Sequence, residues 1–330
     1  MDLPINDTTE VFCLHANANI TFAQTESYTL LESLVTLESA GGGAGGVNKE
    51  AIVGEQVKDL SEKIPAAWNL EDILQKFPVM YEESMNTVLQ QEVVRYNGLL
   101  DQIGMTLGSL KNAIKGTVVM DDKLQAMFDS IYDNKIPGLW AGKAYPSLMP
   151  LSSWVRDLLE RIKFIQEWID VGIPSVFWIS GFFFPQAFLT GSLQNYARRN
   201  TISIDTISFD FEVLKPSWTT LTEMPEAGVY IRGLFLEAAR WDYDTMKLGE
   251  SKQKELYTEM ATIWLKPREN RPKSEDGFYM CPIYKTLNRA GTLSTTGHST
   301  NFVIAVELPT DKAQSHWVKG GVALFCALNY

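Results

Sequence analysis

The sequence is poor in cysteine and histidine. Its 330 residues include 3 cysteines and 3 histidines, and no two cysteines have the spacing of a metal-binding motif. Cys281 and Cys326 lie in the apolar runs FYMCPIY and GVALFCALNY, so we expect buried free thiols there. This sparse, odd count favours a reducing compartment and argues against a disulfide-stabilised secreted domain.

Basic charge and long hydrophobic runs are also scarce. Lys and Arg number 29 against 40 Asp and Glu, which gives a net charge of −11 and excludes a protein that coats nucleic acid or anionic membrane. The longest apolar run, residues 173–185, is too short to cross a bilayer and contains prolines. The N-terminus MDLPINDTTE lacks the charged and apolar segments of a signal peptide. We therefore expect a soluble, intracellular protein with no nucleic-acid or membrane partner.

Catalytic motifs are missing too. The loop AGGGAGG (40–46) has two glycines at the phosphate-loop spacing, but Val47 stands where the pattern requires lysine, so a flexible connector is favoured. The stretch GTLSTTGHSTNFV (291–303) combines hydroxyls with His298, yet no nucleophile elbow accompanies it. Gly297 and His298 are therefore interpreted as hairpin residues that contact a neighbour, and an active site around His298 is the less favoured alternative. The sequence predicts no catalytic, cofactor-binding or metal-binding residue.

Helical periodicity dominates the first 200 residues. Apolar residues recur at three- and four-residue steps over about 24–39, 48–63, 82–115, 121–133 and 151–170, each of which predicts an amphipathic helix. The 82–115 pattern is the strongest. It contains Gly98, Gly104 and Gly108, which cost helix stability and so suggest close packing against another element.

The periodicity changes to two after about residue 200. Short alternating runs separated by turn residues predict six strands, at 202–213, 228–237, 260–267, 278–286, 301–309 and 321–328. With little room for parallel crossovers, these strands favour an antiparallel sheet or a small six-stranded β-barrel. The fold class is therefore α+β, with a helical bundle first and the strands second.

The stretch WISGFFFPQAFLTG (178–191) is too apolar for a surface loop. Pro185 stands where a helix favours proline, in its first turn. Trp178, Phe182, Phe183, Phe184 and Pro185 are the candidate interdomain packing residues. They either anchor the helical part to the β part or form a docking face for a partner or neighbouring domain.

Several blocks resemble one protein family. The sequences IPSVFWISGFFFPQAFLTGSLQNYARRN, PEAGVYIRGLFLEAARWD, YMCPIYKT and HWVKGGVALFCAL are similar to the signature blocks of the C-terminal region of dynein heavy chains. The run HANANITFAQTESYTLLESLVTL resembles the end of the sixth AAA+ module of these proteins, although Cys13 and Ala16 replace the usual Gly and Pro. The stretch GTLSTTGHSTNFV is similar to the form found in axonemal, single-headed inner-arm heavy chains.

The resemblance implies a domain organisation. Residues 1–130 would be the helical small subdomain of the sixth AAA+ module, and residues 131–330 the dynein C-terminal domain, with helices at 131–200 and the β-barrel at 201–330. Tyr330 is then expected to be the C-terminus, and Met1 to lie inside a AAA+ module.

The resemblance also implies a function. The parent protein would be an ATP-driven, minus-end-directed microtubule motor of the axoneme of cilia or flagella. This segment would pack on the AAA+ ring and tune motor output without catalysis of its own, while ATP and Mg²⁺ bind elsewhere in the parent. Its partners would be the rest of the ring and other dynein-complex or axonemal proteins. The alternative is an interaction module that docks another axonemal component.

Overall fold

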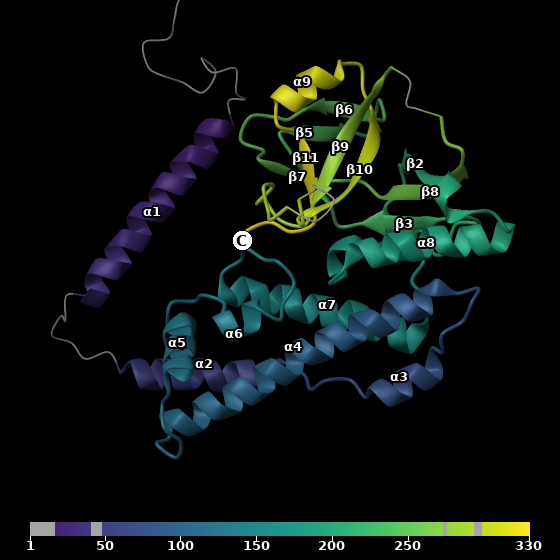
Figure 1. Cartoon of the computed structure of the whole chain (residues 1–330). Coiled ribbons are helices and arrows are strands. Elements are labelled where there is room, and N and C mark those ends of the chain that lie inside the picture. Colours follow the sequence, from purple (N-terminus) through teal and green to yellow (C-terminus); the bar gives the residue numbers. More distant parts are fainter. Residues whose placement is uncertain (1–16, 41–47, 273–275, 294–298) are drawn as a thin grey trace, which may run out of the picture.

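The computed structural model describes residues 17–40, 48–272, 276–293 and 299–330 (Figure 1). Its helices are α1 (Ala18–Ala40), α2 (Lys49–Lys63), α3 (Leu70–Lys76), α4 (Ser84–Ile114), α5 (Asp122–Tyr132), α6 (Gly138–Ala141), α7 (Leu151–Val171), α8 (Pro185–Asn200) and α9 (Gln314–Lys319). Its strands are β1 (Val176–Trp178), β2 (Ile207–Val213), β3 (Val229–Arg232), β4 (Phe235–Glu237), β5 (Ala239–Asp242), β6 (Lys247–Glu250), β7 (Tyr257–Glu259), β8 (Ile263–Glu269), β9 (Phe278–Tyr284), β10 (Phe302–Pro309) and β11 (Ala323–Phe325).

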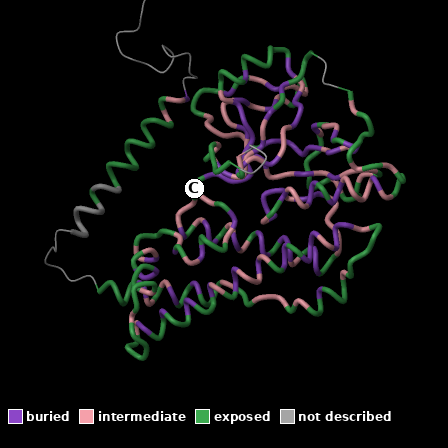
Figure 2. Tube along the Cα trace, in the orientation of Figure 1, coloured by how far each residue is buried: buried purple, intermediate pink, exposed green. Residues whose placement is uncertain are grey.

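Helices and strands form two stacked parts, and α8 contacts both α4 and β2 between them (Figure 1). The predicted helices at 48–63, 82–115, 121–133 and 151–170 are confirmed as α2, α4, α5 and α7. The N-terminal ends of α2 and α5 are capped by the side chains of Asn48 and Asp121, as their composition favours. Buried residues follow the inner faces of α4, α7 and α8 into the sheets (Figure 2).

The long helix α4 organises the helical part. It packs against α2, α3, α5, α6, α7 and α8, and its apolar stripe is buried from Met85 to Leu110. The expected close packing at its glycines is wrong, because a Cβ added at Gly98, Gly104 or Gly108 would meet no atom within 4 Å. The tight approach comes from α8 instead, where a Cβ at Gly191 would lie 3.0 Å from Val88.

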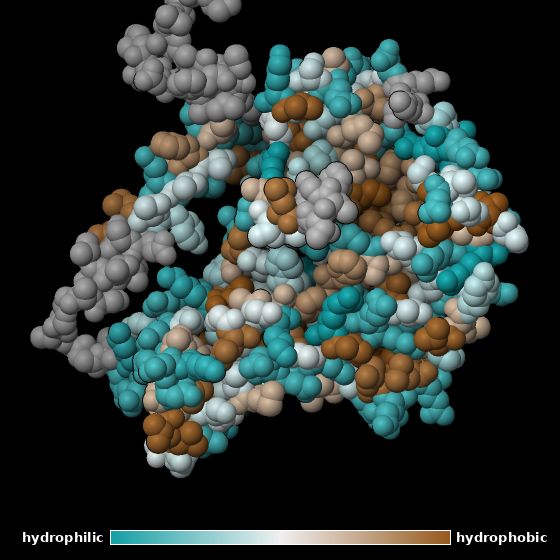
Figure 3. Space-filling model, viewed as in Figure 1, coloured by the Kyte–Doolittle hydropathy of each residue, from teal (hydrophilic) through white to brown (hydrophobic). Residues whose placement is uncertain are grey.

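Helix α1 stands apart from the two stacked parts (Figure 1). Phe22, Tyr28, Leu30 and Leu31 are each 60% or more exposed, and hydrophobic side chains are visible on its surface (Figure 3). The residue before the helix contacts the β part. The Asn17 side chain donates to the carbonyl of Glu255 at 2.8 Å and accepts from the Lys254 N–H at 2.9 Å. The glycine-rich connector at 41–46 lies outside the described residues.

The expected six-stranded antiparallel β-barrel is wrong. The described residues form a four-stranded sheet in the order β1-β3-β8-β2, a five-stranded sheet in the order β10-β9-β11-β4-β7, and the hairpin β5-β6, and none of these closes into a barrel. The pairs β1–β3 and β9–β11 are parallel. The run 228–237, expected as one strand, is divided by Gly233, whose φ of +87° turns the backbone, so that β3 and β4 enter different sheets.

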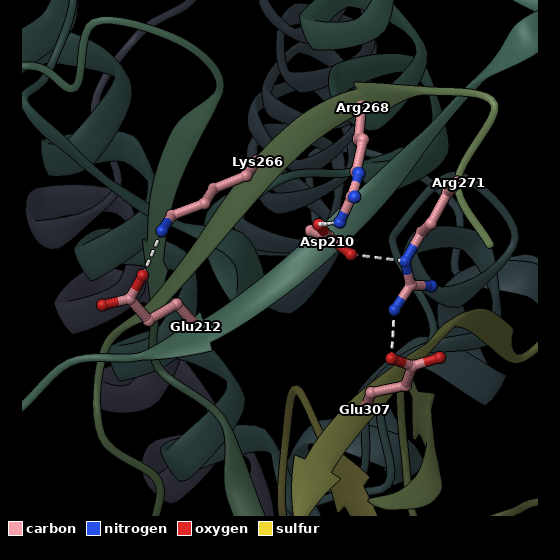
Figure 4. A network of polar contacts seen from close by, with 6 residues as sticks. All are labelled: Asp210, Glu212, Lys266, Arg268, Arg271 and Glu307. Carbon is pink, nitrogen blue, oxygen red and sulfur yellow. Dashed lines mark hydrogen bonds and ion pairs between the residues drawn. The ribbon is translucent and has the colours of Figure 1, made fainter. Parts of the chain in front are cut away.

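Arg271 links the two larger sheets (Figure 4). Its guanidinium pairs with Asp210 of β2 through an Nε–Oδ1 distance of 2.5 Å and with Glu307 of β10. Arg268 also contacts Asp210, at 3.0 Å. Burial acts to raise the pKa of Asp210, but hydrogen bonds from the two arginines outweigh it and lower that pKa below its usual value. The sheets are therefore joined by charge as well as by apolar packing.

Candidate functional site

Residues 176–185, called here the junction segment, connect the helical part to the sheets. Strand β1 adds to the edge of the four-stranded sheet, with Phe177 opposite Ile231 and Trp178 opposite Arg232. A 3₁₀ turn at Ile179–Gly181 follows, and α8 begins at Pro185. Proline suits this first helical position because its φ is already helical and the missing N–H has no partner to lose.

The carboxylate of Glu92 on α4 holds the start of α8. Glu92 is fully buried, and its two oxygens accept from the backbone N–H groups of Phe183, at 2.5 Å, and Phe184, at 3.1 Å. The first N–H groups of a helix lack partners within it, and negative charge is favourable there. Burial raises the pKa of Glu92, although the two backbone hydrogen bonds act to lower it. The side chain thus serves as an acceptor for the turn that precedes α8.

Tyr96 lies one turn further along the same face of α4. Its hydroxyl donates to the carbonyl oxygen of Gly181 at 2.7 Å, and burial raises its pKa well above the usual value, which keeps it a neutral donor. Residues four apart share a helix face, so Glu92 and Tyr96 form hydrogen bonds with neighbouring residues of the junction segment.

The three consecutive phenylalanines have different surroundings. Phe182 is buried and stacks on Phe188 of α8, with ring centroids 4.5 Å apart. Phe183 makes edge contacts with Tyr96 at 5.1 Å and Tyr145 at 5.6 Å. Phe184 remains 40% exposed. Phe182 therefore belongs to the core, Phe183 packs on two tyrosines, and Phe184 reaches the surface.

Two cations cover the exposed phenylalanine. The guanidinium of Arg95 lies 5.2 Å from the centroid of the Phe184 ring, and the ammonium of Lys285 lies 5.7 Å from it. Both distances fall within the range of cation–π attraction. Arg95 belongs to α4 and Lys285 follows β9, so Phe184 lies between the helical part and the sheets.

Trp178 requires glycine at two neighbouring positions. A Cβ at Gly181 would lie 2.8 Å from both Trp178 and Phe164, and a Cβ at Gly233 would lie 2.2 Å from Trp178. Ser180 adds a hydrogen bond of 2.6 Å to the carbonyl of Gly233. The indole thus fills the space that these glycines leave open.

Arg161 of α7 is a buried positive charge close to the junction segment. It is 3% exposed, pairs with Asp157 at 2.7 Å, and lies 3.8 Å from the centroid of the Tyr145 ring. A cavity of about 20 Å³ beside it is lined partly by Lys285 and Cys326. Such a volume holds about one water molecule and is too small for a nucleotide.

The cysteines of the described residues are buried, as expected. Cys281 and Cys326 are free and buried, and burial raises the pKa of Cys326 to about 12. A thiol with so high a pKa is a poor nucleophile. Cys13 lies outside the described residues.

The hairpin candidates Gly297 and His298 also lie outside the described residues. On either side of them, Leu293 and Ser299 form an antiparallel bridge, and the N–H of Thr300 donates to the carbonyl of Thr292 at 2.8 Å. The connection joins the antiparallel strands β9 and β10. The proposed contact of His298 with a neighbour stays a prediction.

Sequence reasoning missed Glu92, Tyr96 and Arg161 as junction residues. A signal was present for Glu92, since Leu89 and Tyr96 place it on the apolar face of α4. A charged residue on such a face needs a buried partner. The partner itself, a pair of backbone N–H groups 91 and 92 residues away, leaves no trace in side-chain patterns.

Metal-binding clusters and membrane-spanning helices are both absent from the described part of the molecule. It holds no group of three or more His, Cys, Asp or Glu side chains placed to bind a metal ion. Of its helices, none combines the length and the apolarity needed to span a bilayer.

Comparison with known proteins gives a consistent result. The family model for the C-terminal domain of the dynein heavy chain matches residues 24–326. The sequence is 60% identical over 328 residues to dynein axonemal heavy chain 1 of Homo sapiens, 51% identical over 328 residues to dynein axonemal heavy chain 3 of Mus musculus, and 49% identical over 329 residues to dynein axonemal heavy chain 12 of Homo sapiens. Each match covers 99% of the 330 residues but only 8%, 8% and 10% of the respective relative.

Proposed function

Because this protein belongs to the dynein heavy chain family, through the C-terminal domain that its sequence matches, we propose that it is the C-terminal part of an axonemal dynein heavy chain. Its parent is an ATP-driven, minus-end-directed microtubule motor of cilia and flagella. The names of the relatives, all axonemal heavy chains, support this assignment. The form of residues 291–303 favours the single-headed inner-arm group.

Within that motor the segment acts as a mechanical element. It packs on the AAA+ ring and tunes how ring motions become motor output. The grip of α4 on the junction segment supports this role, because Glu92 and Tyr96 bind three backbone sites, at Gly181, Phe183 and Phe184. A displacement of α4 is therefore transmitted to α8 and β1 rather than absorbed by a loop.

The division into two units belongs to the same proposal. Residues 1–130 form the helical small subdomain of the sixth AAA+ module, and residues 131–330 form the C-terminal domain. The family model begins at residue 24 and spans both. In this division, the hydrogen bonds from Glu92 and Tyr96 of α4 to the junction segment join the small subdomain to the C-terminal domain.

The segment carries no nucleotide chemistry of its own in this proposal. Val47 replaces the lysine of a phosphate loop, and the cavity of about 20 Å³ beside Arg161 has room for about one water molecule. Calorimetric titration of the 330-residue protein with ATP and with ADP tests this point. We expect no binding heat, and submicromolar binding of either nucleotide would contradict the proposal.

A deletion tests the mechanical role. Removal of residues 201–330 from the full heavy chain is expected to change microtubule-stimulated ATPase activity and gliding velocity, because the ring loses the sheets that the junction segment connects to α4. If both rates equal those of the intact motor, the tuning role is wrong. The alternative function, docking of an axonemal partner, is favoured by a separate feature of the sheets, a cavity beside β3.

A further inference from the structure

A larger cavity lies in the β part, beside the last residue of β3. Its volume is about 370 Å³, near the lower end of the roughly 300–1,000 Å³ range of ligand pockets. Its lining combines apolar, aromatic, polar and charged side chains, among them Trp218, Arg232, Tyr243, Glu259, Met260 and Thr262. We call it the Arg232 cavity.

Arg232 gives the cavity a partly buried cation. Its Nε is buried and has no hydrogen-bond partner in the described part of the molecule. Burial lowers the pKa of the guanidinium, although the charges of Glu259, Glu167 and Glu160 act to raise it. The buried Arg161 and Arg271, by contrast, each have a carboxylate within 2.7 Å. A partly buried cation gains free energy from a hydrogen-bonded anion.

The guanidinium of Arg232 lies against an aromatic ring. It lies against the indole of Trp218, 3.8 Å from the ring centroid. A guanidinium can stack one face on an aromatic ring and still bind a carboxylate through two parallel hydrogen bonds in its own plane.

The wall that carries Trp218 is held in place. The side chain of Ser217 accepts from the N–H of Thr219 at the start of a short 3₁₀ turn, and the hydroxyl of Ser175 donates to the carbonyl of Leu221 at 2.7 Å. The N–H of Leu214 donates to the carbonyl of Thr262. The cavity is thus formed before any ligand arrives, which lowers the ordering cost of binding.

Apolar groups complete the cavity. Met260, which lines the cavity, is buried, while Trp218 and Tyr243 are 40% and 45% exposed. Such partly exposed aromatic side chains are typical anchors of protein interfaces. The exposed Lys215 and Ser217 on the rim can donate hydrogen bonds to the carbonyls of a peptide that crosses it.

The local charge selects the kind of anion. Glu259 also lines the cavity, and Glu167 and Glu160 lie near enough to act on Arg232. These negative charges oppose a doubly charged phosphate more than a singly charged carboxylate. We propose that the Arg232 cavity binds an acidic peptide segment of a partner, with one side-chain carboxylate on Arg232 and a neighbouring apolar side chain against Trp218, Tyr243 and Met260. This inference does not depend on the mechanical role of the junction.

Calorimetry with matched peptide pairs tests the proposal. The 330-residue protein is titrated with acetyl-Leu-Glu-Leu-amide, acetyl-Leu-Asp-Leu-amide and acetyl-Phe-Glu-Leu-amide, and with the glutamine or asparagine form of each. We expect at least one acidic peptide to bind with a Kd below about 1 mM and its neutral form to bind about tenfold or more weakly, the usual value of a charged hydrogen-bonded pair.

Variants locate the site. Arg232→Gln is expected to weaken the acidic peptide about tenfold or more and to leave the neutral peptide unchanged, and the exposed Trp218→Ala should weaken both. Arg156→Gln, an exposed arginine on α7, is the matched control and should change neither. If Arg232→Gln fails to fold, Trp218→Ala still decides the location.

Other results would overturn the proposal. If no acidic peptide binds at about 5 mM, well above the expected Kd, or if binding is the same in Arg232→Gln and Trp218→Ala as in the wild type, the cavity is not the site. If acetate or inorganic phosphate binds as tightly as the best peptide, the cavity holds a free anion and the peptide assignment is wrong.

Discussion

The hydroxyl of Tyr96 on α4 donates a hydrogen bond of 2.7 Å to the carbonyl oxygen of Gly181, 85 residues further along the sequence. One turn before it on the same helix, Glu92 accepts from the N–H groups of Phe183 and Phe184. The helical part therefore binds the backbone of the junction segment directly. These hydrogen bonds do not involve the side chains of that segment.

Tyr96→Phe is expected to destabilise the protein by about 1–2 kcal/mol, because the carbonyl of Gly181 stays buried without its donor. The change is measured as the difference in the free energy of unfolding from urea denaturation. Tyr28→Phe is the matched control, since Tyr28 is 71% exposed on α1, and it should change stability by less than about 0.5 kcal/mol. Equal effects of the two substitutions would show that the hydrogen bond contributes nothing.

Glu92 predicts a pH dependence of stability. Because burial raises its pKa in the folded state, the folded protein binds a proton more tightly than the unfolded one does. This contribution to stability is complete below the usual pKa of 4.5 and is lost as the pH rises through the raised value.

The comparison with Glu92→Gln isolates this dependence. The wild type should lose stability relative to Glu92→Gln as the pH rises from about 4 toward about 8, in urea titrations at each pH. Glu92→Gln itself should be less stable at low pH, since an amide offers one acceptor oxygen to two N–H groups. A stability difference that stays constant across this pH range would contradict a raised pKa.

Glycine substitutions distinguish crowded from open positions. Gly233→Ala should destabilise by about 3 kcal/mol or more, because its Cβ would overlap Trp178 at 2.2 Å and its φ is +87°. Gly98→Ala on α4, where a Cβ meets no atom within 4 Å, should stabilise by about 0.5–1 kcal/mol. Thermal unfolding of both variants provides the test. A loss of stability in Gly98→Ala would contradict the open surroundings of Gly98 and support the close packing expected from the sequence.

The link between the sheets gives a fourth prediction. Arg271→Leu should destabilise by about 1.5–3 kcal/mol, because it removes the charged hydrogen bonds that Arg271 makes with Asp210 and with the nearly buried Glu307. Lys266→Leu, which breaks an exposed pair with Glu212, should cost about 0–1 kcal/mol. A double-mutant cycle of Arg271→Leu with Glu307→Leu measures the coupling, and a coupling near zero would remove Arg271 as the link between sheets.

The helices could be predicted from the sequence better than the strands, for a physical reason. The apolar stripe of 82–115 depends on spacing within one helix, so local pattern is sufficient to locate α4. The run 228–237 looks like one strand, yet a positive φ at Gly233 inside it sends β3 and β4 to different sheets. The hairpin β5–β6 was missed because its strands, Ala239–Asp242 and Lys247–Glu250, are short and charged.

The sequence indicated the junction segment but not the residues that bind it. The apolar run at Phe182–Phe184 identified the segment, and Pro185 correctly located the start of α8. The groups that hold the segment could not be found by spacing, because Glu92 and Tyr96 bind backbone atoms, which every residue possesses. Likewise, nothing local distinguishes Arg232, whose Nε has no partner among the described residues, from the paired Arg271.

The most direct test of the mechanical role uses the full heavy chain with Glu92→Gln and Tyr96→Phe together. The control is Asp101→Asn, an exposed carboxylate on the same helix. Gliding velocity and microtubule-stimulated ATPase activity are measured side by side for the wild type, the double variant and the control. We expect the double variant to change the velocity obtained per ATP hydrolysed, while the control equals the wild type. A double variant whose velocity and ATPase activity both match those of the wild type would contradict the mechanical role.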